Sequence, residues 1–154
     1  MIYLLLGSDT YMKIKKIISI ILVILWMGLI FKMSSYNGID SGNQSGFIVN
    51  FIANIFNINN LDIISFIVRK IAHLSEYLIL GILAHNLIKN YNKKTFIAIL
   101  ICIIYAISDE IHQIFVPGRE FKLLDICIDS IGSIIGIYMY KYILYITNKY
   151  KKIN

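Results

Sequence analysis

The sequence predicts an all-α protein, a polytopic membrane helix bundle of about four transmembrane helices with an amphipathic helix on the outer membrane surface. Three observations support this fold class. Hydrophobic residues make up 58% of the 154 positions, whereas soluble domains contain roughly 45–50% apolar residues. The mean hydropathy is high, at +0.71. The apolar residues also gather in runs close to the length of about 20 residues that crosses the hydrocarbon core of a bilayer.

Four apolar runs are expected to cross the membrane. They cover Ile17 to Phe31, about Val68 to Ile88, about Thr95 to Ile114, and about Leu123 to Ile146. The turn from Lys89 to Lys94 is short, and so is the loop from Phe115 to Lys122, which contains the turn signal Pro117-Gly118. The last three helices are therefore expected to pack as antiparallel neighbours.

The segment from Ser34 to Phe66 is expected to lie outside the membrane. Its first part is rich in serine, glycine and asparagine and predicts flexible turns. The part from Phe47 to Phe66 is apolar and predicts one helix on the outer surface. A fifth span is disfavoured, because Asn60 and Asp62 would lie in its middle. Three asparagines at helical spacing mark the polar face of the predicted surface helix: Asn50, Asn54 and Asn57.

Lysine and arginine residues are distributed unequally between the two ends of the predicted spans. Basic residues favour the cytoplasmic side, so both termini are expected in the cytoplasm. These flanking residues also account for the net charge of +6, and no basic patch interleaved with aromatic residues predicts a nucleic-acid partner. The side of the termini carries Lys13, Lys15, Lys16, Lys89, Lys93, Lys94, Lys141, Lys149, Lys151 and Lys152, and the other side carries Lys32, Arg69, Lys70, Arg119 and Lys122.

The first eleven residues form a short leader that is too brief to cross a membrane. Met12, followed by Lys13, has the features of a translation start, so residues 1–11 are interpreted as a start-site artefact and residues 12–154 as a single transmembrane domain. The first span is expected to be retained, because no small-residue cleavage site follows it. Cys102 and Cys127 are expected at different depths, too far apart for a disulfide.

Ionisable side chains of three spans fall at one depth, in the outer third of the bilayer. Helical spacing puts Arg69, His73 and Glu76 on one face of the second span, and carboxylates end the third span and begin the fourth. A charged side chain within a span costs about 2.5–3.5 kcal/mol, so these groups are expected to face one another or a wet cavity. The candidate pocket consists of Arg69, His73, Glu76, Asp109, Glu110, Gln113, Arg119, Asp125 and Asp129.

Two other interpretations of this pocket remain open. The charges could form an ion-paired plug that only fixes the helix register. His73 and Glu76, at i and i+3, are candidate metal ligands with carboxylates opposite them, although the main expectation is that the protein needs no metal or other cofactor. On the fourth span, Gly132 and Gly136 form a small-xxx-small pattern, which predicts close helix packing.

Four motifs follow one another along the chain and form a recognisable set. They are Arg69-Lys70-x-x-His73-x-x-Glu76-Tyr77-x-x-x-Gly81, Ser108-Asp109-Glu110-x-x-Gln113, Pro117-Gly118-Arg119-x-x-x-x-x-Asp125 and Gly132-x-x-x-Gly136. Together with the segment from Trp26 to Ser35, the sequence resembles the VanZ-like family from Met12 to about Tyr140. Asp129 departs from the pattern, in which an asparagine is expected four residues after the aspartate of the third motif. The resemblance implies a bacterial plasma-membrane protein of the cell envelope, in a family associated with low-level resistance to the glycopeptide teicoplanin.

Three functions remain as hypotheses. The first is an outward-facing buried polar pocket that engages a cell-envelope ligand, either a glycopeptide such as teicoplanin or a lipid-linked precursor. The second is a membrane-embedded hydrolase or transferase acting on a lipid head group, with Glu76 or Asp109 as general base and Arg119 holding an anionic group. The third is a proton-coupled carrier, because acidic groups within a membrane can relay protons. The expected partners are the lipid bilayer and the envelope ligand, and the oligomeric state stays open.

Overall fold

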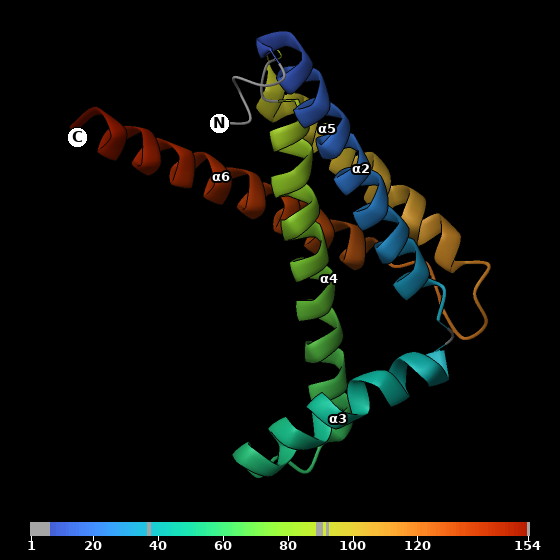
Figure 1. Cartoon of the computed structure of the whole chain (residues 1–154). Coiled ribbons are helices and arrows are strands. Elements are labelled where there is room, and N and C mark those ends of the chain that lie inside the picture. The colour runs from blue at the N-terminus through green and yellow to red at the C-terminus, as the bar shows by residue number, and fades with distance from the viewer. Residues whose placement is uncertain (1–6, 37, 89–90, 92, 154) are drawn as a thin grey trace.

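The computed structural model describes residues 7–36, 38–88, 91 and 93–153, and this part of the chain contains five α-helices and no strand. The helices are α2 (Ser8–Ser34), α3 (Gly38–Phe56), α4 (Leu61–Leu87), α5 (Lys94–Gln113) and α6 (Leu123–Ile153). In Figure 1, α4 runs through the centre, α2 and α5 lie beside it, α6 crosses it, and α3 lies across its lower end. Helix α4 contacts all four of the other helices. The predicted all-α membrane bundle is therefore confirmed.

Three helices, α2, α5 and α6, are individually long and apolar enough to cross a membrane. Helix α4 meets the same criterion only together with the end of α3, from which it is bent by 120°. The bundle thus has three to four candidate spans, in agreement with the predicted number. On α2, Ile24 and Leu25 are 61% and 64% exposed, as expected for apolar side chains that face lipid tails.

The segment between α2 and α4 differs from the sequence prediction. The flexible turn expected after Ser34 is short, because α3 already begins at Gly38. The prediction of a single surface helix from Phe47 to Phe66 is wrong, because α3 ends at Phe56 and the following residues lead into α4. The 120° bend between α3 and α4 is nevertheless the geometry of a helix that lies along a membrane surface beside one that enters it.

The break between α3 and α4 is made by two asparagines. Asn57 has a φ of 50°, in the left-handed region, where helices commonly end. The side chain of Asn60 accepts a hydrogen bond from the backbone N–H of Ile63 at 3.2 Å and caps α4. Helix α4 consequently begins at Leu61 rather than at about Val68, where the second span was expected to begin.

The remaining helix ends agree with the prediction to different degrees. Helix α5 matches the expected third span within one residue at each end. Helix α2 begins at Ser8, within the segment interpreted as a leader, and α6 continues to Ile153, past the expected end at Ile146. The last part of α6 is exposed and projects away from the other helices (Figure 1). The leader residues 1–6 and part of the turn from Lys89 to Lys94 lie outside the described residues.

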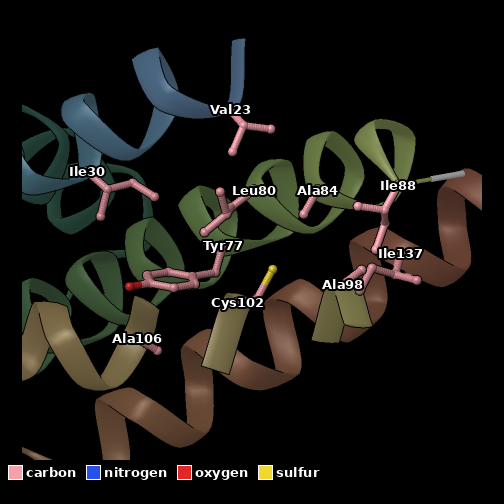
Figure 2. Packing of buried hydrophobic residues seen from close by; sticks show 10 residues of the cluster. All are labelled: Val23, Ile30, Tyr77, Leu80, Ala84, Ile88, Ala98, Cys102, Ala106 and Ile137. Atoms are coloured by element: carbon pink, nitrogen blue, oxygen red, sulfur yellow. The ribbon is translucent and has the colours of Figure 1, made fainter. Parts of the chain in front are cut away.

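The apolar core lies between α2, α4, α5 and α6, as Figure 2 shows from close by. Two polar side chains fasten α2 to this core. The indole Nε1 of Trp26 donates a hydrogen bond to the backbone carbonyl of Glu76 at 2.9 Å, and the hydroxyl of Tyr105 donates one to the carbonyl of Met27. The buried cluster consists of Val23, Ile30, Tyr77, Leu80, Ala84, Ile88, Ala98, Cys102, Ala106 and Ile137.

Helices α4 and α6 touch through their backbones. A Cβ added to Gly81, Gly132 or Gly136 would lie well under 3.0 Å from a backbone oxygen of the facing helix, closer than real side chains approach. Only glycine fits at these positions, which confirms the packing role predicted for Gly132 and Gly136. The oxygens belong to Ser133, Leu74 and Leu78, respectively.

This contact predicts a large loss of stability for Gly136→Ala. The added methyl group meets the backbone of Leu78 rather than a flexible side chain, so the free energy of unfolding should fall by about 1–3 kcal/mol or more. The matched control is Gly28→Ala on α2, where nothing lies within 4 Å and alanine is favoured in a helix by roughly 0.5–1 kcal/mol. Denaturant unfolding in detergent micelles measures both variants. Equal stabilities of the two variants would contradict the backbone contact.

Candidate functional site

The nine predicted pocket residues come from α4, α5, α6 and the loop between α5 and α6. Helices α4, α5 and α6 meet near the start of α6. We call the polar side chains gathered there, the nine predicted residues together with Lys70, the polar cluster. Five of the nine are at most 4% exposed, although all five are polar or charged. These are Asp109, Glu110, Gln113, Asp125 and Asp129.

Two ion pairs join α4 to α6 within the polar cluster. The Nδ1 atom of His73 lies 3.3 Å from Oδ1 of Asp129. One helical turn nearer the loop, the ammonium group of Lys70 donates a hydrogen bond to the carboxylate of Asp125. Both pairs follow from the i, i+4 spacing of the aspartates, which directs them to the same side of α6. Part of the charge in the polar cluster is therefore paired.

Asp109 connects α5 with α2. Its Oδ2 atom accepts a hydrogen bond from the hydroxyl of Ser34 at 2.8 Å and a longer one from the side-chain amide of Gln113 at 3.4 Å. Ser34 is 4% exposed and was not among the predicted residues. The only sequence signal for it was its position at the end of the first span, at the depth expected for the polar cluster.

Glu110 has a structural contact at the start of α6. Its Oε2 atom accepts a hydrogen bond from the backbone N–H of Lys122 at 2.7 Å, and the side chain is fully buried. A carboxylate at a helix N-terminus satisfies a backbone donor and interacts favourably with the helix dipole. Glu110 thus anchors α6 against α5, and it lines neither of the two cavities described next.

Two adjoining cavities open above the polar cluster. The larger, of about 260 Å³, lies between the start of α6, the preceding loop and α4, and Gln113 and Asp125 are part of its wall. The smaller, of about 70 Å³, reaches Glu76 and the end of α2. Both cavities are lined by Arg69, His73 and Arg119. The structure therefore brings the α4 residues Arg69, His73 and Glu76 to one surface, as their spacing predicted.

Positive charge is concentrated at the mouth of these cavities. Arg69, Lys70, Arg119 and Lys122 all line the larger one. Within the described residues, only Lys70 among these four cations forms an ion pair with a carboxylate. Arg119 donates a hydrogen bond from Nε to the backbone carbonyl of Tyr36 at 3.2 Å, and burial together with the neighbouring Arg69 lowers its pKa from the ordinary value. The cavity thus offers positive charge that the protein only partly compensates.

The other histidines lie apart from the ion pairs of the polar cluster. His112 stacks on the ring of Phe31 at a centroid distance of 4.0 Å, and its Nε2 lies 3.0 Å from the hydroxyl of Ser35. His85 is buried against Tyr140 at the other end of α4. These contacts are those of packing residues. The two cysteines are free, with Cys102 buried and Cys127 exposed, in agreement with the prediction that they form no disulfide.

A larger cavity, of about 350 Å³, lies at the opposite end of the bundle between the start of α2 and the end of α4. Its described wall carries lysines, Ser19, Asn86 and Tyr91, but no carboxylate or histidine. The chemistry expected from the motifs therefore belongs to the cavities above the polar cluster.

Comparison with known proteins agrees with the motifs. A family model described as VanZ/LLP1 matches residues 19–145. The matched range includes most of α2 and α6 and every residue of the polar cluster. No curated protein and no solved structure matches the chain. Because the family model covers well over half of the sequence, the chain belongs to the VanZ/LLP1 family.

Proposed function

We propose that this VanZ-like membrane protein binds a cell-envelope ligand through an anionic group that enters the cavities above the polar cluster. The ligand classes are a lipid-linked precursor, whose phosphates would meet the cationic wall, and a glycopeptide such as teicoplanin. Both carry a lipid chain beside a polar group, so both would reach a pocket that opens at a membrane surface. The protein acts as a binding protein in a bacterial plasma membrane.

The observation that carries this proposal is the excess positive charge of the larger cavity, whose wall contains four cations and only two carboxylates, Glu120 and Asp125. Arg69, Arg119 and Lys122 line it without a carboxylate ion pair among the described residues. A guanidinium presents a planar set of donors that matches phosphate and carboxylate oxygens. A cavity of about 260 Å³ accommodates a phosphate-sized group, while the exposed apolar surface of the bundle remains available to the acyl or prenyl chain.

The second candidate function is a membrane enzyme acting on a lipid head group. It is favoured by the smaller cavity, in which the carboxylate of Glu76 and the imidazole of His73 line the same space as Arg119. In this function Glu76 or Asp109 acts as general base while Arg119 holds the anionic group. A proton-coupled carrier has less support, because the apolar core of Leu80, Ala84 and Cys102 separates the polar cluster from the polar residues at the other end of α4.

The proposed orientation has both termini in the cytoplasm and the polar cluster outside. The contact between Lys16 of α2 and Tyr91, which follows α4, supports the grouping of these basic ends on one side. Reporter fusions after Ile88 and at the C-terminus should report a cytoplasmic location, and a fusion after Gly118 should report an external one. An external C-terminus would contradict this orientation and with it the access of an envelope ligand.

The binding function predicts opposite effects for two substitutions in the cavity wall. Arg119→Gln should weaken binding of a polyprenyl pyrophosphate by about tenfold or more, because it removes a charge-assisted hydrogen bond worth about 1.5–3 kcal/mol. Glu76→Gln should strengthen binding, because it removes a negative charge that repels the ligand. Native mass spectrometry of the full chain, titrated with the pyrophosphate, with the uncharged polyprenol and with teicoplanin, measures these affinities.

Lys32 lies near the end of α2 that borders the smaller cavity, but it lines neither cavity. The control for the loss of one positive charge outside the cavity walls is therefore Lys32→Gln. Its affinity should equal that of the wild type. Equal binding of pyrophosphate and polyprenol would refute recognition through the anionic group. If the wild type releases a smaller product from the ligand and Glu76→Gln does not, the result favours an enzyme over a binding protein.

A further inference from the structure

Three side chains with metal-ligating atoms meet on the buried side of the polar cluster. They are His73 of α4, Asp109 of α5 and Asp129 of α6, one from each of the helices that form the site. One ligand atom of each lies within 4.8 Å of those of the other two. Asp109 and Asp129 are at most 2% exposed. We call these residues the three-residue group.

Carboxylate oxygens of both aspartates in the three-residue group have no hydrogen-bond partner. Neither oxygen of Asp129 accepts a hydrogen bond, and Oδ1 of Asp109 accepts none either. The contact of 3.3 Å between Asp129 and Nδ1 of His73 is close enough for an ion pair, yet it lacks hydrogen-bond geometry. Ionised carboxylates that are buried without hydrogen bonds are strongly unfavourable. A divalent cation between these atoms removes that penalty for both aspartates at once.

The geometry fits a transition-metal ion after a small adjustment. Zinc binds imidazole nitrogen and carboxylate oxygen at about 2.0–2.2 Å in tetrahedral geometry, so its ligand atoms lie about 3.5 Å apart. Separations of up to 4.8 Å must therefore close by about 1 Å when the side chains turn toward one ion. One imidazole with two carboxylates is a donor set suited to Zn²⁺ or Mn²⁺.

The surroundings of Asp109 also have the form of a metal site. Its Oδ2 atom accepts hydrogen bonds from Ser34 and Gln113, which leaves Oδ1 as the unpartnered atom. Groups that orient a ligand in this way are usual around bound metals. On its open side, the three-residue group reaches both cavities through His73. Asp109 and Asp129 line neither cavity, so an ion held here would lie behind His73 and act on the cavities through its charge.

We infer that His73, Asp109 and Asp129 bind one divalent transition-metal ion, Zn²⁺ or Mn²⁺, behind the cavity wall formed by His73. The ion would attract the same anionic group as Arg69 and Arg119. This role toward the ligand rests on the proposed function, whereas binding of the ion does not. The Glu76 carboxylate, which the sequence suggested as a partner of His73, lies outside the three-residue group and faces the smaller cavity.

Metal titration of the purified full chain tests this inference. After treatment with a chelator, the wild type should take up about one Zn²⁺ or Mn²⁺ per chain, measured by inductively coupled plasma mass spectrometry. Asp129→Asn and His73→Gln should each lower the affinity more than about 100-fold, since even outer-shell changes typically cost 10–100-fold. Asp62→Asn, the same chemical change at an exposed position in the first turn of α4, should keep the wild-type affinity.

X-ray absorption of the metal-loaded wild type covers the case in which a variant does not fold. The spectrum should show one imidazole and otherwise oxygen ligands. No metal uptake by the wild type, a sulfur ligand, or equal losses in Asp62→Asn and Asp129→Asn would each overturn the site. Polyprenyl pyrophosphate binding is measured on both the metal-loaded and the chelator-treated wild type, so metal uptake without pyrophosphate binding refutes only the proposed function.

Discussion

The backbone contact between α4 and α6 determines how the polar side chains of these two helices meet. Three glycines, Gly81, Gly132 and Gly136, leave no room for a Cβ atom between the two helices. Because this contact fixes the register of α6 against α4, it also fixes which residues of the first turns of α6 face α4. Asp125 lies beside Lys70 and Asp129 beside His73 as a direct result. A helix pair held further apart would leave these aspartates without partners.

Close packing also explains how a membrane bundle tolerates so many ionisable side chains. Each charged residue within a span is costly, and five of the predicted pocket residues are almost completely buried. The protein compensates part of this cost through Lys70, Ser34 and the backbone N–H of Lys122. The unpartnered oxygens of Asp109 and Asp129 are buried, whereas the cations without a carboxylate ion pair among the described residues line the larger cavity. That separation of charge is the property that a bound cation and an anionic ligand would both use.

Much of this arrangement was predictable from the sequence, and the rest was not for identifiable reasons. Apolar run length located the third span within one residue at each end and the start of the fourth at Leu123. Helical spacing put Arg69, His73 and Glu76 on one surface, where all three line the smaller cavity. The break at Asn57 was missed because the asparagines of that segment also fit one continuous helix, and only the backbone conformation distinguishes the two. The partners of Asp109 could not be derived either, since spacing orients residues within one helix but does not tell which neighbour they meet.

The central claim is that helices α4 and α6 bring His73 and Asp129 into contact inside the membrane bundle. Rotational-echo dipolar recoupling in lipid bilayers, with ¹⁵N-labelled histidine and carboxyl-¹³C-labelled aspartate, measures this contact directly. The account predicts a ¹³C–¹⁵N dipolar coupling between the carboxyl carbon of Asp129 and Nδ1 of His73, which lies 3.3 Å from Oδ1 of that carboxylate, and this coupling disappears in His73→Gln. No coupling in the wild type, or the same coupling in His73→Gln, would contradict it.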